Sequence, residues 1–140
     1  MTSDRVARDH FRRSWGRRQV LDGLLALHLY ADVVRESQDI VELILKGALR
    51  FVGVEPPKRH DVHDAVGRFV DRFPGEWRGA LEELRAMLDD LAQDRVSAFY
   101  GDEEHDVPAS DLFGEDDARR AMMVVDRLLE LYGRLLGEAR

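Results

Sequence analysis

The residues with the widest range of chemistry lie in one short run, residues 58–64, where two histidines and two aspartates follow Lys-Arg. Imidazoles three residues apart, with a carboxylate between them, can ligate a metal ion. Such a site needs further ligands from distant segments, and only His28 and His105 are candidates. The alternative is a helix start, with Asp61 and Asp64 in the first turn, where carboxylates stabilise unpaired backbone N–H groups. We interpret the run as a helix start and predict no metal and no cofactor.

An arginine continues a regular leucine stripe in the second half of the chain. Leucines at steps of three and four occupy positions 81, 84, 88 and 91, and the next step reaches Arg95. A guanidinium on the buried line of a helix is costly to desolvate unless a carboxylate or carbonyl meets it. Three explanations stay open: a structural ion pair, an aliphatic stem packed on the bundle with its head in solvent, or a charge in a functional cleft.

His28 lies on the apolar face predicted for a helix over residues 15–30. A single histidine on such a face is more often a core residue bonded to a neighbour than a catalytic group. We therefore predict a buried, structural His28.

Several classes of catalytic site are excluded or unsupported. The 140 residues contain no cysteine, which excludes a thiolate zinc site, a disulfide scaffold and a cysteine nucleophile. The serines lie in no nucleophile-elbow context, and the scattered glycines form no phosphate-binding loop. Paired carboxylates fall on polar faces or at helix starts. These clusters alone identify no enzyme.

Length and composition indicate one globular domain. Hydrophobic residues make up 44% and charged residues 35% of the 140 residues, enough to bury one core. No apolar run is long enough to span a membrane, so we expect a cytoplasmic protein without membrane contact. The net charge of −7 is uneven: residues 1–20 are basic and residues 89–117 strongly acidic. A broad basic face for nonspecific nucleic-acid binding is therefore missing.

The hydrophobic pattern predicts an all-α fold. Apolar residues recur with helical period, and no segment shows sustained strand alternation. The chain is predicted to form an antiparallel up-and-down bundle of four to five helices over residues 15–140, after a basic N-terminal segment, residues 1–14. Residues 101–114 are predicted to be an acidic loop. The helical segments are 15–30, 32–53, a short helix capped by Asp61, 76–100 and 115–137.

Two groups of short motifs follow one another along roughly residues 18–137. The first is Ser37-Gln38, Glu42, Lys46, Gly53, Pro56-Pro57-Lys58 and His60-Asp61-Val62. The second is Arg95, Phe99-Tyr100-Gly101, Pro108 and Asp117-Ala118. Their order and spacing resemble the HEPN domain family, whose members show a Gln-x-x-x-Glu-x-x-x-Lys helix, a Gly and Pro turn and a His-Asp pair. The second group resembles the prokaryotic members.

The resemblance implies a helical bundle that is often a homodimer. Prokaryotic members are frequently encoded beside a minimal nucleotidyltransferase, as a toxin–antitoxin-like pair. Many members are metal-independent ribonucleases that use Arg, four to six intervening residues and then His. That pair suits RNA cleavage, because the guanidinium holds a phosphate while the imidazole transfers a proton.

The chain departs from that ribonuclease motif. The next histidine after Arg95 is His105, too far along the chain, and Tyr100 stands near the expected place. A phenol that titrates near ~10 is a poor general base at neutral pH. The formal match, Arg5 with His10, lies in the N-terminal segment.

We therefore predict a non-catalytic, homodimeric binding module. Its ligand would be a nucleotide, an RNA or a partner nucleotidyltransferase. The predicted cleft contains Arg95, which would pair with a phosphate or a partner carboxylate, Tyr100, which would stack or hydrogen bond, and the His60-Asp61 turn with Lys58. The alternative is a degenerate metal-independent ribonuclease in which His105 or His10 transfers the proton. A third hypothesis is a structural dimer without a ligand.

Overall fold

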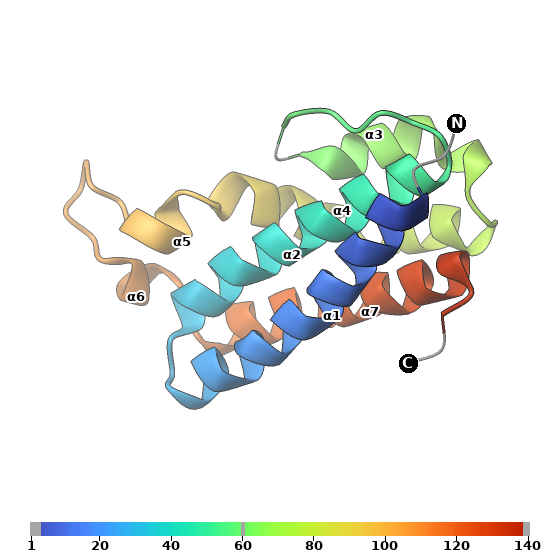
Figure 1. The fold of residues 1–140 in the computed structure, drawn as a ribbon. Helices are drawn as coiled ribbons and strands as arrows, with labels where there is room; N and C mark the ends of the chain where they lie inside the picture. Colours follow the sequence, from blue (N-terminus) through green and yellow to red (C-terminus); the bar gives the residue numbers. More distant parts are fainter. Residues whose placement is uncertain (1–3, 60, 139–140) are drawn as a thin grey trace.

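The computed structural model describes residues 4–59 and 61–138, and within these ranges the fold is all-α, as predicted. Figure 1 shows a bundle in which four long helices run side by side, with short helices at the ends. The long helices are α1 (Asp4–Ala26), α2 (Tyr30–Phe51), α4 (Glu76–Asp94) and α7 (Glu115–Leu136). The short ones are α3 (Val62–Arg68), the 3-10 turn η1 (Val70–Arg72), α5 (Ser97–Tyr100) and α6 (Ala109–Leu112).

The core lies where α2 packs against α1 and α7 (Figure 1). The fourth long helix, α4, contacts both α2 and α7. Two apolar lines run along α7, and both are buried within the chain. The first line contains Ala118, Met122, Val125, Leu129, Tyr132 and Leu136, and the second contains Ala121, Val124, Leu128 and Leu131. Burying apolar surface on both lines is the main stabilising contribution available to such a helix.

The first helix begins earlier than predicted. The expected boundary between residues 14 and 15 falls inside α1, which runs without a break from Asp4 to Ala26. Ala7, Phe11 and Ser14 recur at steps of four and three and are buried, so residues 4–14 belong to the bundle. The buried Ser14 hydroxyl donates to the carbonyl of His10 at 2.7 Å, which satisfies its polar group within the helix.

The prediction of a buried His28 is wrong. The helix ends at Ala26, and His28 is exposed in the turn before α2, with a φ of 59°. Its ring stacks on Tyr30, with centroids 5.7 Å apart. The chain must reverse direction between Ala26 and Tyr30, and a residue in the left-handed region makes that reversal at a modest conformational cost.

The helix predicted over residues 76–100 is interrupted after Asp94, and a separate short helix, α5, follows. Gly101 ends α5 with a φ of 76°, where a Cβ would collide with the backbone of Val107 and Pro108. Asp102 and Val107 then exchange backbone hydrogen bonds of 2.8 and 2.9 Å, which close the acidic loop. Among the described helices, none combines the length and apolarity needed to cross a membrane.

Candidate functional site

Arg95 follows α4 directly and lies against the middle of α2. Its Nε is 3.7 Å from Asp39 Oδ1 and 3.7 Å from Glu42 Oε1. The side chain is only 27% exposed, and Nε is buried without a hydrogen bond to any described residue. Of the three explanations for this arginine, the structure supports an ion pair: two carboxylates of α2 offset the cost of burying the guanidinium.

Further polar side chains of α2, half-buried or buried, organise the same region. Arg35 donates to Asp39 at 2.6 Å, and Gln38 donates to Glu42 at 3.1 Å. The Arg35 guanidinium also lies over the Phe99 ring, 5.4 Å from its centroid. Arg35 and Arg95 therefore offset the charges of Asp39 and Glu42. Arg35 contacts α5 through Phe99, and Arg95 ties the chain to α2 just before α5 begins.

Three large apolar side chains around α5 face solvent, and we call them the α5 face. Val96 is 62%, Phe99 54% and Tyr100 62% exposed. The two aromatic rings meet edge to face, with centroids 4.7 Å apart. Exposed apolar side chains that lie together are one of the features of interaction sites on folded proteins.

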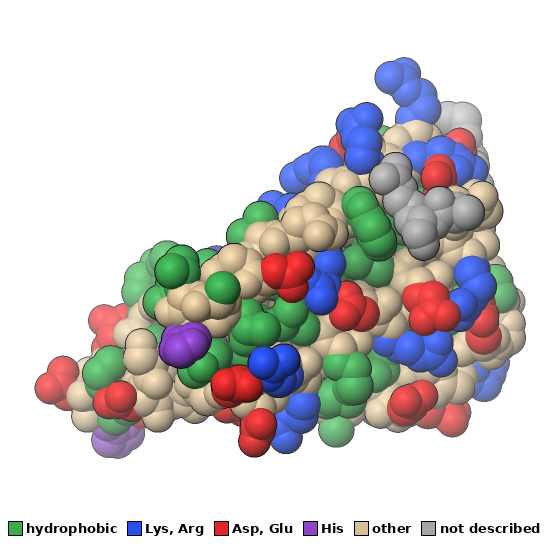
Figure 2. All heavy atoms as spheres, turned by 90° about the horizontal axis from the view of Figure 1, so that it is seen from below, with side chains coloured by type: hydrophobic (Ala, Val, Ile, Leu, Met, Phe, Trp, Pro, Cys, Tyr) green, Lys and Arg blue, Asp and Glu red, His purple; other side chains and the backbone are tan. Residues whose placement is uncertain are grey.

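The loop after α5 is acidic. Four of the five residues at positions 102–106 are acidic, namely Asp102, Glu103, Glu104 and Asp106, and the fifth is His105. His105 is exposed and its Nδ1 lies 2.9 Å from Asp102 Oδ2. Figure 2 shows acidic side chains at the narrow left end of the molecule, the end that this loop occupies in Figure 1. The α5 face thus has a negatively charged border.

The other residues predicted for the cleft lie at the start of α3. Asp61 lines a cavity of about 280 Å³ together with Arg59, Arg68 and Arg85. Lys58 is exposed, and His60 lies outside the described residues. Within the described ranges, no hydrogen bond or ion pair joins Lys58 or Asp61 to Arg95 or Tyr100. Asp61 precedes α3 as expected, but its side chain caps no backbone N–H.

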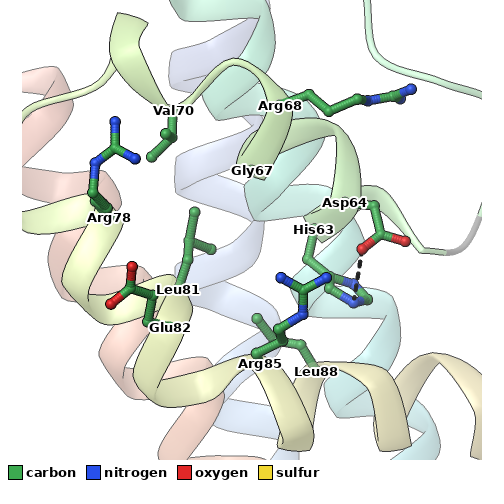
Figure 3. Close-up of a pocket in the computed structure, with 10 residues that line it drawn as sticks. All are labelled: His63, Asp64, Gly67, Arg68, Val70, Arg78, Leu81, Glu82, Arg85 and Leu88. Carbon is green, nitrogen blue, oxygen red and sulfur yellow. Dashed lines mark ion pairs between the residues drawn. The ribbon is translucent and has the colours of Figure 1, made fainter.

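A second cavity of about 330 Å³ lies between α3 and α4 (Figure 3). On its wall the buried His63 lies 2.6 Å from Asp89 Oδ1 and 3.8 Å from Asp64 Oδ1, both measured from Nε2. These three residues could supply ligand atoms to a metal ion. The hydrogen bond already accounts for the imidazole nitrogen, so we assign the trio to holding α3 against α4. The spacing of residues 58–64 indicated His63 but not Asp89, which is 26 residues away.

A cluster of cations around His10, where α1 crosses α2 closely, was not predicted from the sequence. A Cβ on Gly47 of α2 would lie 2.9 Å from the His10 Cβ. The His10 Nδ1 is buried and has no hydrogen-bond partner among the described residues. Burial lowers the pKa of His10, and the positive charges of Arg13, Arg50 and Lys46 lower it further, while Asp9 acts in the opposite direction. The pattern of one histidine in a helix could not reveal neighbours on another helix.

The lowered pKa of His10 predicts a pH-dependent stability. The unfolded chain takes up a proton near the ordinary pKa of 6.5, whereas the folded protein resists protonation at this site. Stability from this residue is therefore present above that value and is lost as the pH falls below it. The free energy of unfolding, measured with urea, should fall between about pH 7.5 and about pH 5.5. It should fall less for His10→Gln than for the wild type. An equal loss in both proteins would contradict this assignment.

Comparison with known proteins adds one finding. The family model of the HEPN domain matches residues 7–135, nearly the whole chain. No curated protein matches, and no solved structure matches. The match begins within the first turns of α1 and ends in the last turn of α7, so it reaches every helix described above. The chain therefore belongs to the HEPN domain family.

Proposed function

We propose that this HEPN-domain protein is a non-catalytic binding module whose partner protein docks on the α5 face. The observation that supports the proposal is the exposure of Val96, Phe99 and Tyr100, each more than half accessible and all close together in the chain. Aromatic residues dominate the binding energy of protein interfaces when a partner pocket encloses them. Arg35 and Arg95 hold the segment in position before the partner arrives, which limits the entropy lost on binding.

The border of the α5 face defines the chemistry of the partner. Asp102, Glu103, Glu104 and Asp106 make this end acidic, so the partner should have an apolar pocket with a basic rim. The family resemblance implies a minimal nucleotidyltransferase encoded beside the gene, and we propose that protein as the partner. In this arrangement Arg95 is a positioning residue, because Asp39 and Glu42 already occupy one side of its guanidinium.

A second candidate ligand is the base of a nucleotide or of an RNA strand. The exposed ring of Tyr100 favours this ligand, because a nucleobase of any type can stack on an aromatic side chain without hydrogen bonds to its edge. The acidic border opposes a phosphate backbone at the same place. We therefore rank the protein partner first and treat base stacking as an outcome of the test.

The test measures binding of the purified neighbouring nucleotidyltransferase by calorimetry. Tyr100→Ala and Phe99→Ala should each weaken binding by roughly thirtyfold, the effect of an interface residue worth about 2 kcal/mol. Phe69→Ala is the matched control, because Phe69 is an exposed aromatic on another part of the surface, beside Arg72. Unchanged affinity in both α5 variants would overturn the docking proposal.

Two further arms separate the roles. Arg95→Ala should lower the melting temperature and weaken binding together, and Arg95→Lys should restore part of both, as expected of a positioning residue.

Labelled RNA should be neither bound through Tyr100 nor cleaved. Loss of RNA binding in Tyr100→Ala would support base stacking instead, and chelator-resistant cleavage that disappears in His105→Ala would support the ribonuclease alternative.

A further inference from the structure

The cavity between α3 and α4 (Figure 3) combines an apolar lining with charged side chains of both signs. Of the apolar residues, Leu88 is buried, and Val70 and Leu81 are partly buried against the core. The volume of about 330 Å³ is at the lower end of the range for small-molecule pockets, about 300–1,000 Å³. The cavity shares no lining residue with the α5 face, so an inference about it does not depend on the docking proposal.

The two helices that form this cavity are already held together. The imidazole of His63 on α3 lies 2.6 Å from the carboxylate of Asp89 on α4, and His63 is buried. One turn further along α3, a Cβ at Gly67 would meet no atom within 4 Å, so the space beside this lining residue is open. A cavity that exists before binding limits the entropy lost when a ligand enters it.

The three arginines of the cavity differ in what their guanidinium groups contact. Arg78 donates to Asp71 at 2.5 Å, and Figure 3 shows the Arg68 side chain pointing away from the cavity. The Arg85 side chain points toward α3 in the same view. Within residues 4–59 and 61–138, no hydrogen bond or ion pair engages the Arg85 guanidinium. Of the three, Arg85 is therefore the cation that is available to a ligand.

The acidic residues of the cavity divide in the same way. Asp64 Oδ1 lies 3.8 Å from His63 Nε2, whereas no cation of the described chain pairs with the Glu82 carboxylate. Glu82 and Arg85 are three residues apart on α4, and Figure 3 shows both side chains on the side of α4 that faces α3. An ion pair between them on this exposed helix surface would contribute little to stability. A ligand that contacts both groups can therefore compete with it.

A small molecule with a carboxylate, an ammonium group and an aliphatic chain would complement this lining. The planar guanidinium of Arg85 matches a carboxylate, and the Glu82 carboxylate attracts an ammonium group. Val70, Leu81 and Leu88 offer apolar surface to the chain. We propose that the cavity binds a free α-amino acid with an aliphatic side chain. A purely anionic ligand would be repelled by Glu82, and a purely cationic one by Arg85.

Isothermal titration calorimetry of the full chain with L-leucine and three analogues tests this proposal. Isocaproate lacks the ammonium group, isoamylamine lacks the carboxylate, and L-serine replaces the aliphatic chain with a small polar one. Each analogue should bind at least about tenfold more weakly than L-leucine, because each leaves one part of the lining without its partner. No saturable heat with L-leucine, or equal affinity for isocaproate or isoamylamine, overturns the proposal.

Variants of the lining place the binding in this cavity. Glu82→Gln and Arg85→Gln should each weaken L-leucine binding about tenfold. The matched controls Glu83→Gln and Arg59→Gln, at exposed residues that do not line this cavity, should stay within about twofold of wild type. Gly67→Leu changes no charge and should abolish binding by filling the open space, with a melting temperature that shows a folded protein. Equal losses in the controls, or wild-type affinity in folded Gly67→Leu, contradicts the site.

Discussion

Gly47→Ala is expected to lower the free energy of unfolding by about 3 kcal/mol, because a methyl group has no space where α1, α2 and α7 meet. The added Cβ would collide with the Tyr132 hydroxyl and would lie 2.9 Å from the His10 Cβ and 3.0 Å from Tyr132 Cζ. Tyr132 is fully buried, and its hydroxyl donates to the carbonyl of Ala7. The ring cannot move away without breaking that hydrogen bond.

The same substitution elsewhere should have the opposite sign. Gly16 lies within α1 and Gly79 within α4, and a Cβ at either would meet no atom within 4 Å. Alanine there should stabilise the protein by about 0.5–1 kcal/mol through its better helix propensity. Urea unfolding of the three variants provides the comparison. A Gly47→Ala protein as stable as wild type would show that the three helices do not meet as described.

A double-mutant cycle can locate the cause of the Gly47 effect. Tyr132→Phe removes the hydroxyl and should by itself cost about 1–2 kcal/mol, because the Ala7 carbonyl loses a buried donor. In the Tyr132→Phe background, however, the nearest colliding atom is gone. Gly47→Ala should therefore cost less there than in the wild type, and additive effects would exclude the Tyr132 hydroxyl as the obstacle.

Trp77→Ala is expected to destabilise the protein by about 4 kcal/mol, the usual cost of truncating a fully buried tryptophan. Trp77 has no exposed surface and stands in the first turn of α4, with its ring 4.7 Å from that of Phe73. The pair covers the core where η1 turns into α4. Its loss leaves a void between rigid helices, which cannot collapse fully.

Thermal unfolding of Trp77→Ala beside Arg78→Ala provides the measurement and its control. Arg78 follows directly in the sequence but is exposed, and its only ion pair among the described residues is with the exposed Asp71. Alanine there should change stability by less than about 0.5 kcal/mol. Trp77→Phe should fall between the two. Similar melting temperatures for Trp77→Ala and Arg78→Ala would contradict the burial of Trp77.

The helices could be predicted because burial imposes a period on the sequence. The leucines of α4 and both apolar lines of α7 repeat with that period, and all but the edges of these lines are buried. The ends of the helices were less predictable, as His28 shows. The place where a helix ends depends on the residues packed around it, and the apolar spacing of the sequence can continue beyond that end.

The partners of polar residues could not be predicted from spacing. Arg95 stood out on its leucine stripe, but its pairing with Asp39 and Glu42 depends on how α4 crosses α2. Asp89 and His63 meet for the same kind of reason. The close approach of His10 and Gly47 gave no signal at all, since a histidine in a basic segment and a glycine in a helix are both common in sequences.

The hydrogen bond from Tyr132 to Ala7 joins residues 125 positions apart. During synthesis on a ribosome, α1 and α2 emerge long before α7 exists to receive them. Until then, the apolar surface of the α1–α2 hairpin that α7 later covers is exposed. Chaperones that bind exposed apolar surface would bind the nascent chain there. The native packing of α1 and α2 against α7 can therefore form only after α7 has been synthesised.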